Sequence, residues 1–151
     1  MSSQGPMAPY QRAVPVLQVA DVEKSLHWYF DVLGFTPDPF PEKPPYSFAM
    51  LRRDEAEIML QGADRPRSAH SPRSPDPVFV WTVYLRVNGT KILDIAAAVE
   101  KTTQLLRGPE RMFYGLVEFE IRDPDGYRVC VSGEAPPGTN VRLHVESDDA
   151  P

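Results

Sequence analysis

The chain contains an internal repeat, which limits the folds open to it more than any other feature of its sequence. The segments VLQVADVEKSL and YLRVNGTKILD align so that Leu17 matches Leu85 and Val19 matches Val87. In both, an alternating apolar segment leads into a polar position and then into apolar residues at helical spacing. Identity between the segments is thin, and the shared order of strand, cap and helix is the stronger evidence. The repeat predicts two copies of one supersecondary unit.

The first copy is predicted to be a strand, a helix and three further strands. Residues 13–20 alternate as a strand does, and Asp21 is a good N-cap. Gly34 sits where a glycine commonly ends a helix, so residues 21–33 are predicted to be helical. The apolar residues predicted to face the sheet are Val22, Leu26, Tyr29, Phe30 and Leu33.

The rest of this copy follows from turn and strand signals. FTPDPFPEKPP is predicted to be extended or loop, and YSFAMLRR and AEIMLQG to be strands joined by a short turn at Asp54. The second copy begins with the strand FVWTVYLRV and the helix TKILDIAAAVEKTTQLL, with fraying of the helix after Val99 as an alternative. It ends with the strands GLVEFEIRD and YRVCVSG around the turn signal DPDG. Both copies are interpreted as βαβββ modules, which is an α+β fold.

Composition divides the chain into one domain and a tail. Residues 63–77 are rich in Pro, Ser and Arg without an apolar pattern, and are predicted to link the modules. Module one then covers about residues 13–62 and module two about 78–134, within a single domain of residues 1–134. Residues 135–151 form a tail with an acidic end and a candidate short strand.

Charge and leader signals narrow the partners and the location. The net charge of −5 argues against nucleic acid and anionic membranes as partners. The single cysteine, Cys130, cannot form an internal disulfide, and no apolar run is long enough to span a membrane. The first residues also lack the features of a secretory signal. We therefore expect a cytoplasmic protein.

Two longer motifs resemble a known superfamily. AVPVLQVADVEKSLHWYFDVLGF and FYGLVEFEIRDPDGYRVCVSGE, in this order, resemble the opening and closing segments of the vicinal-oxygen-chelate superfamily, also called glyoxalase/bleomycin resistance protein/dioxygenase. The resemblance covers roughly residues 13–134 and is greatest to the bleomycin-resistance branch. It implies a curved mixed sheet around a groove, helices on the outer face, a role in antibiotic resistance, and a homodimer that exchanges N-terminal arms.

The superfamily's enzymes hold a divalent metal in the groove, and the resemblance implies where its ligands would fall. Those positions are Val14, Thr82, Cys130 and either Met59 or Gln61. Valine cannot bind a metal, and threonine and methionine are poor ligands for the metals these enzymes use. Cys130 would need partner ligands, and the three histidines do not supply them at ligand spacing: His27, His70 and His144. We therefore predict no metal, no cofactor and no catalytic residues.

Strand alternation, with the vacated metal positions as inward markers, predicts which side chains line the groove. The predicted ligand-binding residues are Gln18, Met59, Gln61, Thr82, Tyr84, Arg86, Phe113, Tyr114, Glu118 and Arg128. Aromatic rings, amides and mixed charge suit a flat, partly cationic compound held by stacking and hydrogen bonds.

These observations favour a metal-free small-molecule binding protein of the bleomycin-resistance type, which sequesters an aromatic or cationic compound between its modules. A bleomycin-like compound is the first candidate ligand. The alternative is an enzyme of the superfamily, a lyase, isomerase or dioxygenase, that recruits a metal through non-standard ligands such as Glu57, Gln61 and Glu118.

Overall fold

The structure, a computed structural model, describes residues 8–63 and 81–145. Module one contains β1 (Val16–Val19), α1 (Val22–Leu33), β2 (Thr36–Phe40), β3 (Phe48–Arg53) and β4 (Ala56–Gly62). Module two contains β5 (Val83–Arg86), α2 (Ile92–Glu100), β6 (Arg107–Arg111), β7 (Val117–Arg122) and β8 (Arg128–Gly133). The linker predicted over 63–77 lies almost wholly outside the described residues.

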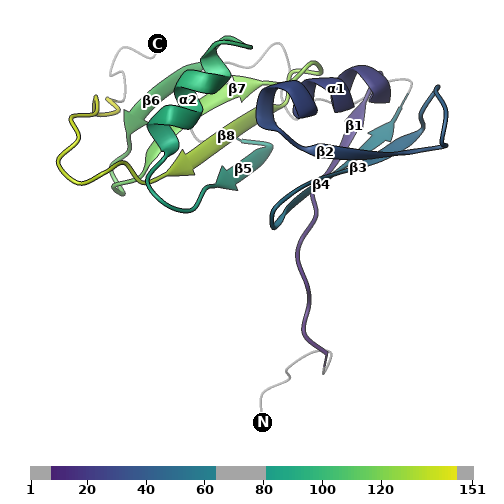
Figure 1. Ribbon diagram of the computed structural model, residues 1–151, viewed down its shortest axis with the longest axis horizontal. Helices are drawn as coiled ribbons and strands as arrows, with labels where there is room; N and C mark the ends of the chain where they lie inside the picture. The colour runs from purple at the N-terminus through teal and green to yellow at the C-terminus, as the bar shows by residue number, and fades with distance from the viewer. Residues whose placement is uncertain (1–7, 64–80, 146–151) are drawn as a thin grey trace, which may run out of the picture.

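Each module folds into a four-stranded sheet with one helix across it. The strand orders are β1-β4-β3-β2 and β5-β8-β7-β6, so the two sheets have the same topology. In each, the first and last strands of the module run parallel and the other pairs are antiparallel. The sheets lie side by side with both helices on the same side (Figure 1). The predicted α+β fold of two βαβββ modules is confirmed.

Helix α1 forms as its sequence predicts, with one exception. The side chain of Asp21 accepts a hydrogen bond from the main-chain N–H of Lys24, and Gly34 ends the helix with a φ of 73°. Leu26, Tyr29 and their neighbours on the stripe are buried, but Phe30 is 53% exposed, so its predicted place against the sheet was wrong. Phe30 lies at the margin of the stripe, and Ser25 is buried at the other margin instead.

Helix α2 is shorter than its full predicted span, and strand β6 was not predicted. The helix predicted over residues 90–106, with fraying after Val99 as the alternative, ends at Glu100, where the hydroxyl of Thr102 donates to the Val99 carbonyl at 2.9 Å. Such side-chain bonds compete with helical ones and favour termination. Strand β6 was missed, because its sequence RGPER has neither alternation nor β-branched residues.

The DPDG turn between β7 and β8 also docks module two on module one. Asp123 accepts a hydrogen bond from the Tyr29 hydroxyl at 2.8 Å. Asp125 accepts from the Ala20 N–H at 3.0 Å and the Ser25 hydroxyl at 3.2 Å. Burial raises the pKa of Asp123, although its hydrogen bonds oppose that shift. A segment predicted only as a turn is therefore part of the contact between the modules.

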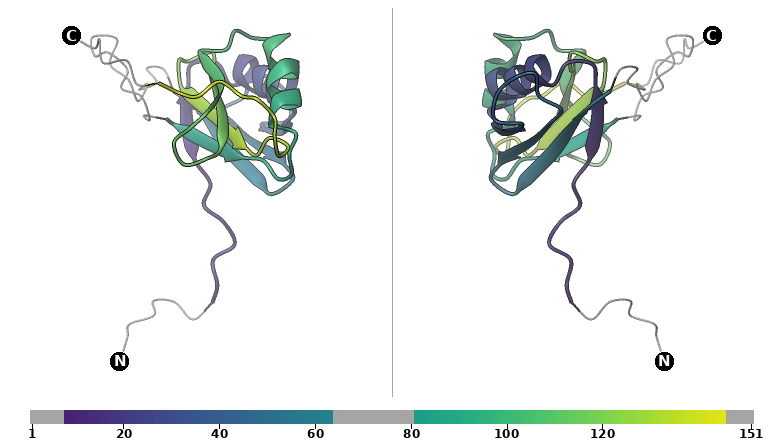
Figure 2. Two further views of the ribbon diagram at one scale, coloured as in Figure 1. Left: turned by 90° about the vertical axis from the view of Figure 1, so that its left-hand side faces the viewer. Right: turned by 90° about the vertical axis from the view of Figure 1, so that its right-hand side faces the viewer.

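The two ends of the described chain behave differently. The tail returns to β6, where the Arg111 N–H donates to Arg142 O at 2.7 Å and the His144 N–H to Arg111 O at 2.8 Å. The predicted tail strand amounts to one bridge between Arg111 and Leu143. The N-terminal residues 8–13 are exposed and extend away from the body (Figure 2). Within the described residues, no helix is long and apolar enough to cross a membrane.

Candidate functional site

The face of the first sheet that points away from α1 is open. Met59 pairs with Val16, and Gln61 with Gln18, so these side chains share that face. Val16 is 50% exposed, and Met59 is half-buried. Gln18, Met59 and Gln61, all predicted ligand-binding residues, therefore form a shallow surface of thioether, aliphatic and amide groups.

The equivalent face of the second sheet is closed by its own charged side chains. Glu118 and Glu120 lie on this face of β7 and have no exposed surface. Arg107, from β6, contacts both carboxylates, with its Nη2 3.2 Å from Glu118 Oε1 and its Nε on Glu120 Oε2. Arg128 Nη2 lies 2.7 Å from Glu120 Oε1. Buried charges this closely paired are strongly held, because separating them would leave an uncompensated charge inside the protein.

Tyrosines and the tail complete this cluster. The hydroxyls of Tyr84 and Tyr114 both donate to Glu118 Oε2, the former at 2.7 Å. Burial and the Glu118 carboxylate raise the pKa of both phenols. At the outer end, Glu110 lies 2.8 Å from Arg107 Nη1 and 2.7 Å from His144 Nδ1. Burial would raise the pKa of Glu110, but these two partners outweigh it and lower the pKa.

Of the positions that the resemblance assigns to a metal, those of Cys130 and Val14 do not fit one. A thiolate is the metal-binding form of cysteine, and burial together with Glu118 and Glu120 raises the pKa of the Cys130 thiol far above its usual value. Val14 offers no donor atom. Nowhere in residues 8–63 and 81–145 do three or more His, Cys, Asp or Glu side chains gather as a metal site would require.

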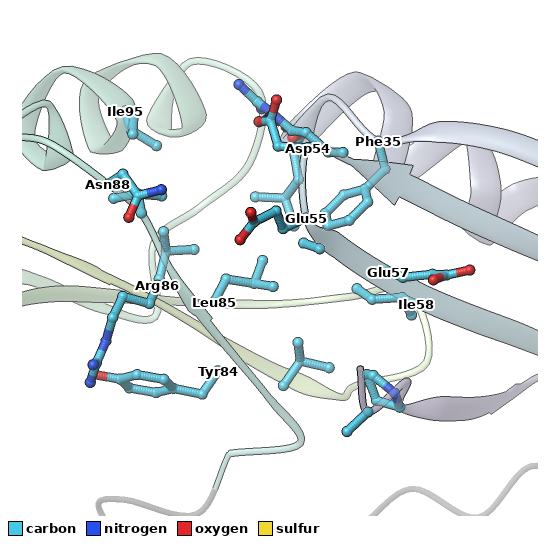
Figure 3. Close-up of a pocket in the computed structure, with 18 of the residues that line it drawn as sticks. Phe35, Asp54, Glu55, Glu57, Ile58, Tyr84, Leu85, Arg86, Asn88 and Ile95 are labelled. Carbon is cyan, nitrogen blue, oxygen red and sulfur yellow. Dashed lines mark hydrogen bonds and ion pairs between the residues drawn. The ribbon is translucent and has the colours of Figure 1, made fainter. Parts of the chain in front are cut away.

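A cavity of about 750 Å³ lies between the modules. One wall is β5, and the other is the β3–β4 turn with the start of β4 (Figure 3). The apolar part of its lining comes from the helix-facing sides of both sheets and from both helices, and includes Leu33, Phe35, Ile58, Leu85, Ile95 and Val131. The volume falls within the usual range for small-molecule sites.

Charged groups surround this apolar lining. Three carboxylates come from the β3–β4 turn and β4: Asp54, Glu55 and Glu57. Glu57 is paired with Arg12 at 3.5 Å and Arg52 at 3.2 Å. Glu55 points into the cavity (Figure 3), and within the described residues no ion pair or hydrogen bond engages its carboxylate. On the opposite wall, Arg86 lies beside the Tyr84 ring.

Nine of the ten predicted ligand-binding residues therefore divide into three groups. Thr82, Tyr84 and Arg86 line the cavity, although the Tyr84 hydroxyl also bonds to Glu118 in the closed cluster. Gln18, Met59 and Gln61 lie on the open face of the first sheet, and Tyr114, Glu118 and Arg128 belong to the closed cluster of the second. Phe113, beside Tyr114, is 88% exposed.

Sequence reasoning missed the cavity wall at Phe35 and Glu55. The sequence signal for this wall was the turn predicted at Asp54. In the structure, Asp54 has a φ of 52°, which is unusual for a residue other than glycine. Nothing in the sequence indicated that this turn faces β5 across the boundary between the modules.

Comparison with solved structures places the fold among similar chains. A virulence protein from Salmonella typhimurium is 25% identical with a TM-score of 0.58, covering 85% of this chain and 100% of its own. A lactoylglutathione lyase from Agrobacterium tumefaciens is 18% identical with a TM-score of 0.59, covering 85% and 95%. TioX from Micromonospora sp. ML1 is 15% identical with a TM-score of 0.61, covering 80% and 96%.

Among curated protein sequences, no match was found. The sequence profile of the Glyoxalase/Bleomycin resistance protein/Dioxygenase superfamily matches residues 12–131, from the start of module one into the last strand of module two. Neighbours with names as different as a lyase and a virulence protein share the fold, so the fold alone does not select one activity. The chain belongs to the glyoxalase/bleomycin resistance protein/dioxygenase superfamily.

Proposed function

We propose that this protein binds a small aromatic or cationic compound, without transforming it, in the cavity between its two modules. The observation that carries the proposal is the cavity itself, about 750 Å³ with an apolar lining and the Glu55 carboxylate directed into it. Apolar walls with a few well-placed polar groups are typical of small-molecule sites.

The lining supports both parts of the ligand's chemistry. Tyr84 supplies aromatic surface for a flat ring, with the almost fully buried Phe35 behind the apolar lining, and Glu55 supplies a charge that favours a cation. The binding role, rather than catalysis, rests on the side chains at the superfamily's metal positions. Valine, threonine and a buried thiol of raised pKa supply neither a chelating centre nor an activated nucleophile.

Calorimetric titration with two cations, ethidium and bleomycin, tests the proposal. We expect at least one of them to bind, and Glu55→Gln to weaken that binding about two- to fivefold, because a partly exposed charge pair contributes modestly. Uncharged phenanthridine serves as the matched ligand, and its binding should not change. Glu100→Gln, an exposed substitution at the end of α2 that does not line the cavity, is the matched variant.

Two results would contradict the proposal. One is the absence of binding by either cation at millimolar concentration. The other is stoichiometric Mn, Ni, Fe or Zn in elemental analysis of the purified protein, which would favour the enzyme alternative and a metal site built from other residues.

A further inference from the structure

Strand β5 presents its edge, rather than a face, to the cavity. Residues 82–88 line the cavity without interruption, so side chains from both faces of the strand contribute to the wall. In the sheet order of the described residues, β5 stands at the end, and β8 is the strand with which it pairs there. Figure 3 shows the strand running along the cavity opposite the β3–β4 turn. An edge strand carries main-chain N–H and C=O groups that lack a strand partner.

The hydrogen bonds between β5 and β8 show which main-chain groups of β5 point away from β8. Val87 donates its N–H to Ser132 O at 2.8 Å, while Ser132 is the register partner of Arg86. In a parallel pair, residues whose main chain bonds the neighbouring strand alternate with residues whose main chain points away. Leu85 and Val87 are thus directed to β8. The alternation holds within β5 itself, since just before the strand the Thr82 N–H also donates to Arg128 O at 2.9 Å. Tyr84 and Arg86 direct their main-chain N–H and C=O groups toward the cavity.

The opposite wall faces the cavity with side chains of the β3–β4 turn and of the start of β4. Strand β4 pairs with β3 from Ala56 on and with β1 only from Met59 on. What it and the preceding turn present to the cavity are apolar surface at Ile58 and the carboxylates of Glu55 and Glu57. Glu57 is already paired with Arg12 and Arg52, and Asp54 lies 3.8 Å from Arg53. Within the described residues, Glu55 is therefore the cavity carboxylate that is available for an added cation.

We propose that the cavity takes compounds with a short extended peptide backbone, which pair with the free edge of β5 and direct a basic group to Glu55. This inference rests on the proposed binding function and narrows its ligand from any aromatic or cationic compound to an amide-bearing one. Added strands obtain affinity from main-chain hydrogen bonds and specificity from alternate side chains. Here those side chains would meet the apolar lining around Leu85 and Ile95 on one face, and Tyr84 with Arg86 on the other.

Paired synthetic peptides test the backbone contact directly. The probe is the peptide acetyl-Ala-Val-Lys-Val-Ala-amide. It is compared with one version that carries a methyl group on the main-chain nitrogen of the lysine, and with another that carries it on the main-chain nitrogen of the following valine. Consecutive amides of an extended peptide point in opposite directions, so only one of the two faces β5. We expect one methylated peptide to bind at least about fivefold more weakly and the other to bind nearly as well as the parent.

Hydrogen exchange measured by NMR gives a second readout on the protein itself. With the parent peptide bound, the amides of Tyr84 and Arg86 should exchange more slowly, while the amide of Leu85, already bonded to β8, should change little. Equal binding of both methylated peptides, or unchanged exchange at Tyr84 and Arg86, would overturn the inference.

The remaining outcomes separate this inference from the proposed function. Binding of ethidium without any binding of the peptides would overturn the peptide proposal and leave the binding function standing. Failure of both ligand types would overturn both. Protection of Tyr84 and Arg86 without peptide, rising with protein concentration, would show that a second copy of the chain occupies the edge, and would also overturn the inference.

Discussion

The faces of the two sheets that point away from the helices have the same strand order but different side chains. In module two, Glu118 and Glu120 are fully buried and held by Arg107 and Arg128. On the equivalent face of module one, Met59 and Gln61 on β4 are not buried. The paired charges of that face, Glu57 with Arg12 and Arg52, lie at the start of β4, and both arginines are exposed. One copy of the repeat has closed its face with buried, paired charges, and the other leaves most of its face open. A repeat in topology thus does not imply a repeat in function, and the cavity lies between the two.

The largest loss of stability is expected when a carboxylate is removed from the closed face. Glu120→Ala leaves Arg107 and Arg128 buried with one acceptor fewer, and we expect a loss of about 3–5 kcal/mol in the free energy of unfolding. A control substitution on the open face of module one, Gln61→Ala on β4, should cost less than about 0.5 kcal/mol. Urea denaturation measures both. Similar small losses would mean that the cluster is hydrated and the two faces are alike.

The tyrosines that cover Glu118 should have the next largest effect. Tyr84→Phe and Tyr114→Phe each remove one hydrogen bond to a buried carboxylate, and each should lower stability by about 1–2 kcal/mol. Tyr10→Phe, in the exposed arm, is the control and should leave the denaturation midpoint unchanged. If Tyr114→Phe behaved like the control, Tyr114 would not be part of the closed face in solution.

The pH dependence of stability should trace part of the cluster to Glu110. Its folded pKa is lowered by Arg107 and His144, so its stabilisation is present above the ordinary carboxyl pKa of about 4.3 and is lost as the pH falls through the folded value. The difference in unfolding free energy between wild type and Glu110→Gln should be constant near neutrality and shrink in acid. A difference that grew toward low pH would reverse the sign and contradict this assignment.

The smallest effect is expected on the open face of module one. Val16 is half-exposed, so Val16→Asp should change the free energy of unfolding by no more than about 0.5 kcal/mol. Sedimentation of wild type and variant adds a test of the predicted homodimer. If the variant dissociated an assembly that the wild type forms, a second copy would cover this face. The face would then be open in the monomer but not in the homodimer.

Local signals in the sequence predicted the fold well. Asp21 and Gly34 predicted α1 because capping depends on residues within one turn, and DPDG predicted the β7–β8 turn for the same reason. Strand β6 was missed because it is held by pairing with β7 rather than by its own pattern. Phe30 was misplaced because helical spacing marks a stripe but not its exact edge.

The candidate site was less predictable, for a physical reason. Alternation placed Glu118 and Arg128 on the correct face of their strands, but it gives no information on whether a face is filled from elsewhere. Arg107, in the missed strand, and His144, in the tail, close that face. The cavity depends on how the modules dock, through contacts such as Tyr29 with Asp123 that are distant in sequence.

The measurement that tests the central claim most directly is an NMR titration of the labelled protein with a bound cation such as ethidium. If the cavity between the modules is the site, the largest chemical-shift changes should fall on Phe35, Glu55 and Tyr84, which come from both of its walls. Changes concentrated instead on Met59 and Gln61 would place the ligand on the open face of module one and contradict the account.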